Sequence, residues 1–222
     1  MTYRQLLTLS KVEKNKRLKF KCVHRHNGLT HSPCYDQAHG LIEKVGYLDI
    51  ETSNLSSDFG CILSYCIGDD NEKLIGRVLT PQEIKSGIYD KILLKELCAD
   101  LKRFTRIITY YGSRFDIPFC RSRSLLYHLP FPTYKTLWHT DAYLVVKYKL
   151  GTLHSRRLGV VAPFYGISAK GHPLNPTVWL KCLSGNQNAL NFVWSHNKED
   201  VITLKRLWHK ISQYTKLNRT SI

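Results

Sequence analysis

The sequence lacks a long apolar run: nothing in its 222 residues approaches the roughly 18 apolar residues that a membrane-spanning helix needs. Residues 1–7 hold too short an apolar stretch for a secretory signal. Internal repeats and low-complexity tracts are missing as well. We therefore expect a globular, cytoplasmic protein whose seven cysteines, an odd number, are reduced thiols.

Acidic residues are scarce. Asp and Glu number 17 against 33 Lys and Arg, which gives a formal net charge of +16. Such a surplus points to a polyanionic partner, with nucleic acid ahead of an acidic membrane surface. The sequence offers no basic amphipathic helix with a convincing apolar face, so a membrane-surface protein is disfavoured. A hydrophobic share of 43% is enough for a packed core and excludes a disordered chain.

Composition divides the chain near residue 44. Residues 1–44 hold nine Lys or Arg, three acidic residues and four of the ten histidines. They predict a small basic N-terminal module with a short helix over about residues 3–17. Residues 45–222 form the main domain in this interpretation.

The main domain alternates strand and helix patterns. Three strand patterns in succession, a helix, a fourth strand and then helices predict a mixed α/β sheet flanked by helices. The expected strands are 45–50, 60–67, 73–79 and 106–111. The expected helices are 81–103, 117–128, 141–149, 186–196 and 198–213, with 159–176 as loop.

Acidic residues recur at the ends of these elements. Asp49 and Glu51 end the first strand, and residues two apart on a strand point to the same face. Asp116 follows the fourth strand. His196 and Asp200 are four apart, so a helix places them on one face. Each has an ordinary structural explanation alone, as a helix cap or a dipole partner; their order and contexts together favour one site.

Four gathered carboxylates repel one another unless cations bind among them. Oxygen-rich sites of this kind suit Mg²⁺ or Mn²⁺. Two such ions can stabilise the attacking and leaving oxygens of a phosphodiester. The acidic cluster and the basic remainder of the chain therefore indicate one activity, metal-dependent hydrolysis of nucleic acid.

Three segments carry a family resemblance. Residues 46–52, 115–118 and 196–201 resemble the three motifs of DEDD-type 3′–5′ exonucleases of the ribonuclease H-like superfamily. The third motif is most similar to the YprB-type predicted exonuclease branch, which also resembles polymerase proofreading domains. The resemblance covers about residues 45–213 and implies a ribonuclease H-like fold.

The resemblance also implies roles. Asp49, Glu51 and Asp200 would ligate two metal ions directly, and Asp116 would hold the second ion partly through water. His196 would orient or deprotonate the attacking water, a suitable task for a group that titrates near neutrality. Asp141 falls where relatives often carry a further acidic residue, close to the site without a direct role.

Two positions depart from the family pattern. The spacing from His196 to Asp200 is that of a subgroup that carries tyrosine where this chain has histidine. The second motif often has Asn before its glycine, and here that residue is Tyr111. The first departure concerns the pH dependence and the second the grip on substrate, and both leave the proposed metal ligands in place.

The implied function is a 3′–5′ exonuclease acting on single-stranded DNA or RNA. Two alternatives remain open at this stage: an endonuclease on the same fold, and a non-catalytic nucleic-acid-binding module. The complete set of acidic residues argues against the second. The sequence itself gives no support for a separate replication or repair partner.

The N-terminal module contains a Cys/His-rich loop. Structural zinc needs four tetrahedral ligands, and closely spaced Cys and His are its usual donors. The expected set is Cys22, His26, His31 and Cys34, with His24 or His39 as substitutes. The alternative is a basic loop whose thiols are simply free. A zinc ion would fold a module too small for its own core and make it a grip on nucleic acid.

Positive charge is concentrated near the second motif. Residues 98–157 carry eleven Lys or Arg against three acidic residues, a local charge of 11 − 3 = +8. Arg114, Arg121 and Arg123 flank Asp116, and we expect some of these candidates to border the active site and meet phosphates. Tyr111 is a candidate for stacking on a base, although strand aromatics are commonly core residues.

Overall fold

The computed structural model describes residues 9–39, 43–168, 175–217 and 220–222. The chain divides into two compact units, Met1–Glu43 and Lys44–Ile222, and each is described by itself. The first unit contains helices α2 (Lys11–Lys19) and α3 (Ser32–Ala38). The N-terminal part of the helix expected over residues 3–17 lies outside the described residues.

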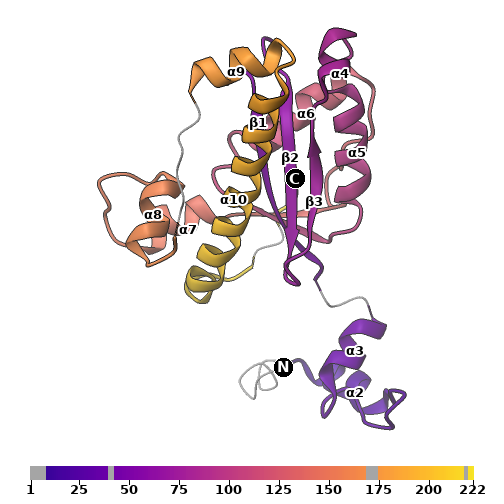
Figure 1. Cartoon of the computed structure of the whole chain (residues 1–222). Helices are drawn as coiled ribbons and strands as arrows, with labels where there is room; N and C mark the ends of the chain where they lie inside the picture. Colours follow the sequence, from indigo (N-terminus) through magenta and orange to yellow (C-terminus); the bar gives the residue numbers. More distant parts are fainter. Residues whose placement is uncertain (1–8, 40–42, 169–174, 218–219) are drawn as a thin grey trace. The chain divides into compact units, whose positions relative to one another are not determined.

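A five-stranded mixed sheet forms the centre of the second unit (Figure 1). The strand order is β3-β2-β1-β4-β5, with β2 antiparallel to both β1 and β3, and β1, β4 and β5 mutually parallel. The strands are β1 (Val45–Thr52), β2 (Ile62–Asp69), β3 (Leu74–Val78), β4 (Arg106–Thr109) and β5 (Trp138–Asp141). The predicted architecture, a mixed α/β sheet flanked by helices, is confirmed.

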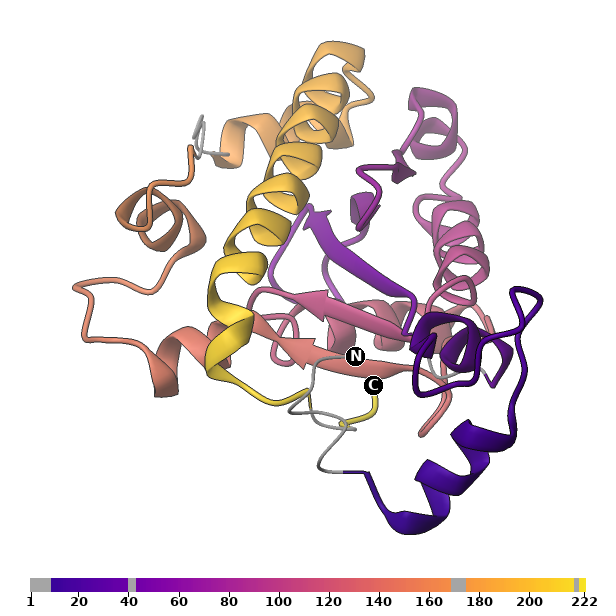
Figure 2. The ribbon, with the colours of Figure 1, turned by 90° about the horizontal axis from the view of Figure 1, so that it is seen from below.

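Helices cover both faces of this sheet, as Figure 2 shows. They are α4 (Pro81–Lys85), α5 (Lys91–Leu101), α6 (Asp116–Leu126), α7 (Ala142–Lys149), α8 (Leu158–Phe164), α9 (Pro176–Leu183) and α10 (Gln187–Ile211), followed by a 3₁₀ turn at Ser212–Tyr214. Of the helices within the described ranges, none has both the length and the apolar character needed to cross a membrane.

The two faces bury separate apolar clusters, and β1 contributes to both. Leu48 and Ile50 pack in the cluster that contains the buried side chains of α5 and α6. Tyr47 packs in the cluster of α7, α8 and the later turns of α10. Since strand side chains alternate, Asp49 and Glu51 lie on the Tyr47 face, which α10 crosses. The central strand therefore presents both carboxylates toward the longest helix.

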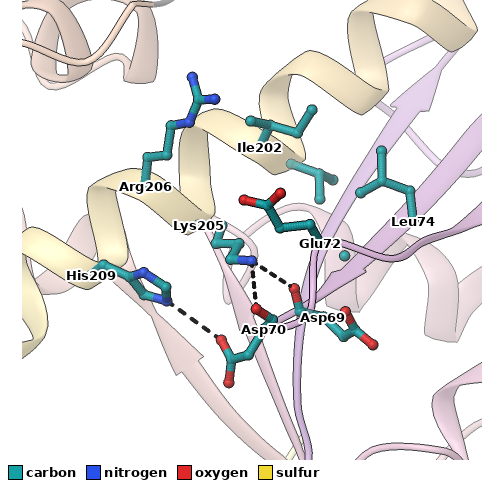
Figure 3. A pocket seen from close by; sticks show the side chains of 10 residues that line it. Asp69, Asp70, Glu72, Leu74, Ile202, Lys205, Arg206 and His209 are labelled. Carbon is teal, nitrogen blue, oxygen red and sulfur yellow. Dashed lines mark hydrogen bonds and ion pairs between the residues drawn. The ribbon is translucent and has the colours of Figure 1, made fainter.

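Side chains of helix α10 contact the turn between β2 and β3 (Figure 3). Lys205 Nζ donates to the backbone carbonyls of Asp69 at 3.0 Å and Asp70 at 2.9 Å. His209 Nε2 lies 3.4 Å from Asp70 Oδ1. These residues line a hollow of about 360 Å³, and no residue of the predicted acidic site is among its lining residues. These contacts join α10 to the turn between β2 and β3.

The predicted helix over 81–103 is interrupted. Helix α4 ends at Lys85 and α5 begins at Lys91, because the intervening chain turns with positive φ at Gly87 (+72°) and Tyr89 (+48°). The turn delivers Asp90 to the protein interior, where it is fully buried. At the C-terminus the reverse holds: the two predicted helices are one continuous helix, α10.

Asp90 pairs with Arg123 in the interior. Arg123 Nε and Nη2 donate to the two carboxylate oxygens of Asp90 at 3.0 and 2.6 Å. The backbone N–H of Ile62 and the hydroxyl of Tyr127 donate to the same carboxylate, both at 2.9 Å. The prediction that Arg123 meets phosphates is therefore wrong: its guanidinium joins α6 to the start of α5 and of β2.

Removing the acid from this pair leaves a buried, unpaired cation. We expect Asp90→Ala to lower the free energy of unfolding by about 3–5 kcal/mol, measured by urea denaturation of the full chain. The matched control is Arg103→Ala, which breaks an exposed pair with Asp100 and should cost less than about 1 kcal/mol. Equal losses in the two variants would contradict the structural role given to the buried pair.

Candidate active site

Two carboxylates enter the site from β1. Asp49 lies in the ladder opposite Cys66, and Glu51 lies two residues further, just before a register shift between Glu51 and Thr52. β1 pairs with β4 before the acids, at residues 45–47, and with β2 at both acids, so the β2 ladder fixes their direction. The side chain of Glu51 is 14% exposed. Both acids are thus held on the most constrained strand of the unit.

A third carboxylate comes from the first residue of α6. Asp116 is buried, and its Oδ1 accepts a hydrogen bond of 3.2 Å from the backbone N–H of Ile50, between the two acids of β1. The turn before it depends on a close approach at Gly112, where a Cβ would lie 2.3 Å from Thr109 Oγ1. Only glycine fits that turn, which places Asp116 against the end of β1.

Asp141 fixes the same turn from β5. Its carboxylate accepts hydrogen bonds from the backbone N–H groups of Tyr111 (2.8 Å), Ser113 (3.0 Å) and Tyr143 (3.0 Å). The last of these caps the N-terminus of α7. Its negative charge also contributes to the raised pKa of Asp116. The structure thus places Asp141 close to the site as a residue that positions its backbone.

Helix α10 brings the remaining predicted residues. His196 Nε2 lies 3.3 Å from Asp200 Oδ2, one helical turn further, and 3.7 Å from Glu51 Oε1. One ligand atom from each of Glu51, His196 and Asp200 lies within 4.8 Å of the others. All five predicted residues therefore gather at one place, from β1, α6 and α10.

Asn197 also lies in this site, and it is not among the site residues predicted from the sequence. Its Nδ2 donates to Asp49 Oδ2 at 2.6 Å, and its Oδ1 accepts a hydrogen bond of 3.1 Å from Ser64 Oγ on β2. Asn197 is fully buried. The sequence did contain a clue, because Asn197 directly follows His196 in the third motif. An amide that faces the sheet from a helix is buried and needs hydrogen-bond partners, which the nearby site residues can supply.

Burial, with neighbouring charges as a smaller cause, raises the pKa of three of the carboxylates, Asp49, Glu51 and Asp116. Burial raises the pKa of Glu51 to about 8, with the nearby charges of Asp200 and Asp116 adding to the effect and His196 opposing it. Burial likewise raises the pKa of Asp116 to about 7. Burial and then the surrounding carboxylates raise the pKa of Asp49 well above its ordinary value, although the Asn197 amide opposes this. The site is therefore electrostatically unfavourable with all of its acids ionised.

A site of this composition fits hard divalent cations. Its carboxylate oxygens are the ligands that Mg²⁺ and Mn²⁺ prefer, and the His196 imidazole lies beside them, with no thiol among the gathered donor atoms that the structure describes. Positive ions among these acids would relieve their mutual repulsion and favour the ionised forms. The raised pKa values and the donor types thus both support a site for divalent cations.

The predicted nucleic-acid contacts differ in exposure. Arg114 and Arg121 are exposed, the first in the turn before Asp116 and the second on α6. Tyr111 is 43% exposed and adopts a positive φ of +68°, with its ring edge-on to Tyr143. Arg123 is the exception, being engaged with Asp90 as described above. Three of the four side chains are thus open to a ligand.

The N-terminal unit holds a second cluster. Its members are Cys22, His24, His31 and Cys34, and one ligand atom from each lies within 4.8 Å of the others. The cluster therefore contains His24, one of the two substitutes considered above, in the place where the sequence favoured His26. His26 packs instead edge-on against the ring of His31, with centroids 5.4 Å apart.

Among solved structures, the chain is similar in fold to the family B DNA polymerase from the hyperthermophilic archaeon Pyrobaculum calidifontis, with a TM-score of 0.63 and 15% sequence identity. The alignment covers 77% of this chain and 25% of the polymerase chain, so the shared part is about a quarter of the polymerase. No curated protein sequence matches the chain.

A sequence family accounts for most of the second unit. The family model of the RNase H superfamily matches residues 46–212, from β1 to the end of α10. The match spans well over half of the chain and includes all five residues gathered at the acidic site. The chain belongs to the RNase H superfamily.

Proposed function

We propose that this protein is a metal-dependent 3′–5′ exonuclease that hydrolyses phosphodiester bonds of single-stranded DNA or RNA. Membership of the RNase H superfamily indicates a hydrolytic nuclease with nucleic acid as its substrate. The observation that carries the finer proposal is the convergence of four carboxylates and one histidine at the end of β1: Asp49, Glu51, Asp116, Asp200 and His196.

The acids are proposed to hold two divalent ions. Asp49, Glu51 and Asp200 would be direct ligands, and Asp116 would hold the second ion partly through water. Two Mg²⁺ or Mn²⁺ ions, when bound, would supply positive charge at both the attacking and the leaving oxygen of the phosphodiester. The buried amide of Asn197 holds the Asp49 carboxylate in one orientation, which leaves its other oxygen for an ion.

His196 is proposed to act on the attacking water. Its imidazole is held between two carboxylates, and the hydrogen bond from its Nε2 to Asp200 raises its pKa. The neutral ring is the form that accepts a proton, so His196 works as a base only at a pH where it has lost its own proton. Asp200 fixes the ring through the adjacent helical turn.

The surroundings suit a single strand. Arg114 and Arg121 offer exposed guanidinium groups for phosphates, and Tyr111 offers a partly exposed ring for a base. The 3′–5′ direction rests on the resemblance of the three sequence motifs to DEDD-type exonucleases. An endonuclease on the same fold would use the same ions and is distinguished by its products.

The direct test is degradation of 5′-labelled single-stranded DNA and RNA with Mg²⁺ or Mn²⁺. We expect a ladder that shortens from the 3′ end, requires the metal, and loses at least about a thousandfold in rate in Asp49→Ala, since a proposed direct metal ligand is removed. The comparison of the two substrates reveals the preferred sugar.

Three outcomes would overturn parts of the proposal. Long internal fragments in place of a ladder would make the protein an endonuclease. Cleavage that persists in Asp49→Ala would place the activity elsewhere or in a contaminant. Tight binding of either strand without cleavage in any metal would make the acidic site non-catalytic.

Asn197 provides a test of positioning. We expect Asn197→Ala to lower cleavage by about 10–100-fold, because the Asp49 carboxylate loses the amide that orients it, and to raise the Mg²⁺ concentration needed for half-maximal rate. The matched control is Asn191→Ala on the exposed side of the same helix, which should leave both quantities unchanged. A lower rate with an unchanged Mg²⁺ requirement would contradict a role through Asp49.

A further inference from the structure

The N-terminal unit carries a metal site of its own. We propose that Cys22, His24, His31 and Cys34 bind one Zn²⁺, which folds residues 9–39 into a basic unit that grips the nucleic-acid backbone. The four donors come from the turn after α2 and from the region around the start of α3, so they join the two helices of the unit. The zinc site does not depend on the proposed nuclease activity. The proposal that this unit binds the nucleic-acid backbone does rest on that activity.

The distances between the donors match tetrahedral zinc. Bond lengths of about 2.3 Å to sulfur and about 2.0–2.1 Å to nitrogen place the S and N atoms of a tetrahedral site about 3.6 Å apart. Cys22 Sγ lies 3.5 Å from His31 Nδ1 and 3.9 Å from His24 Nδ1, and Cys34 Sγ lies 3.7 Å from His24 Nδ1. Three separate pairs therefore have the spacing that a central ion would impose.

Thiol–imidazole hydrogen bonds explain this cluster less well. Such bonds account for pairs of residues, but they give no reason for four donor atoms to lie mutually within 4.8 Å. Two thiols and two imidazoles are also the ligand set of a closed structural zinc site, unlike the carboxylates of the acidic site. The backbone turn at Cys22, in which the N–H of Arg25 donates to the Cys22 carbonyl at 2.8 Å, brings His24 back toward Cys22.

The unit needs such a ligand because it has little core. Among its described residues, Cys22 and Tyr35 are the hydrophobic side chains that are buried. Arg17 and Ser32 are the buried polar side chains of the described part of this unit. The Arg17 guanidinium lies 4.4 Å from the Tyr35 ring centroid and bonds to Asp36 at 2.6 Å, Glu13 at 3.0 Å and Ser32 at 3.1 Å. A unit of this size usually requires a metal or disulfides to stay folded.

The same network leaves the surface strongly basic. Both acidic residues within residues 9–39, Glu13 and Asp36, are paired with Arg17. Within that described stretch, six other cations have no ion pair: Lys11, Lys14, Lys16, Lys19, Lys21 and Arg25. Five of the six are exposed, and Lys14 is partly so. Six cations without an ion pair within fifteen residues (11–25) of a protein of net charge +16 fit a phosphate backbone.

Metal analysis of the full chain tests the site. We expect one zinc per chain in the purified wild-type protein, and replacement by Co²⁺ to give the visible absorption of a tetrahedral thiolate–imidazole site. His24→Ala should lose the zinc, whereas His26→Ala should keep it, because the two histidines are neighbours in sequence but only His24 belongs to the cluster.

Several results would overturn the metal site. A wild-type chain that contains no zinc and does not take up Co²⁺ would overturn the site. This result needs no variant, so it stands even where a variant fails to fold. Zinc lost in His26→Ala and kept in His24→Ala would assign different ligands. Cys34→Ser, which keeps the size of the side chain, must likewise release the zinc; retention in this variant would leave the site with another fourth ligand.

The grip is tested by binding of single-stranded oligonucleotide in buffer without Mg²⁺. The triple variant of Lys16, Lys19 and Lys21 to Ala should reduce the slope of log affinity against log salt by about 2, since each lost phosphate contact on a single strand contributes about 0.7. The control is a triple Ala variant of exposed lysines of the second unit: Lys73, Lys85 and Lys95. An equal loss of slope in both variants, or no loss in either, would overturn the grip.

The two proposals fail separately. A chain that holds zinc and binds DNA or RNA but never cleaves would refute the exonuclease and keep the N-terminal site. A chain that cleaves with Mg²⁺ but contains no zinc would refute the N-terminal site and keep the exonuclease.

Discussion

Repulsion among buried carboxylates is the constraint on which the second unit depends. Asp116 is buried and Asp49 and Glu51 are partly buried, each with a raised pKa, and Asp200 adds its charge from α10. A fold seldom retains such a group unless something offsets the cost. The backbone N–H of Ile50 and other fixed donors offset part of it, and cations of charge +2 would offset the remainder.

Polar groups around these acids hold the site's backbone and side chains in position. The Asp141 carboxylate holds the turn that leads into α6, and the Asn197 amide holds Asp49. The buried pair of Asp90 and Arg123 joins α5, α6 and the start of β2 on the other side of the sheet. The donor types of the two units also differ: the oxygen donors of one suit Mg²⁺ or Mn²⁺, and the thiol and imidazole donors of the other suit Zn²⁺.

Local patterns predicted much of this arrangement. Period-two alternation put Asp49 and Glu51 on one face of a strand, and a four-residue spacing put His196 beside Asp200 on a helix. The four predicted strands are all present. Features set by tertiary contacts escaped: the four-residue β5, the helices α8 and α9, and the break before Asp90.

The errors at the sites have the same origin. Arg123 follows Asp116 by seven residues and is as basic as its neighbours, so only the buried position of Asp90 reveals its role. His24 and His26 are chemically equivalent in sequence, and the turn after Cys22 selects between them. Residue type and spacing identified the candidates, and long-range packing selected among them.

The central claim is that the acidic residues of the second unit are arranged to bind cations. The most direct test is to measure the melting temperature at different pH values, with and without Mg²⁺. With pKa values of about 7 for Asp116 and about 8 for Glu51, against about 4 in an unfolded chain, the folded metal-free protein binds more protons between those limits. The contribution of these acids to stability therefore falls as pH rises through that window. Saturating Mg²⁺ should then raise the melting temperature more at about pH 8 than at about pH 5.5, and far less in Asp49→Asn. An Mg²⁺ effect that is equal at both pH values, and equal in wild type and Asp49→Asn, would contradict the account.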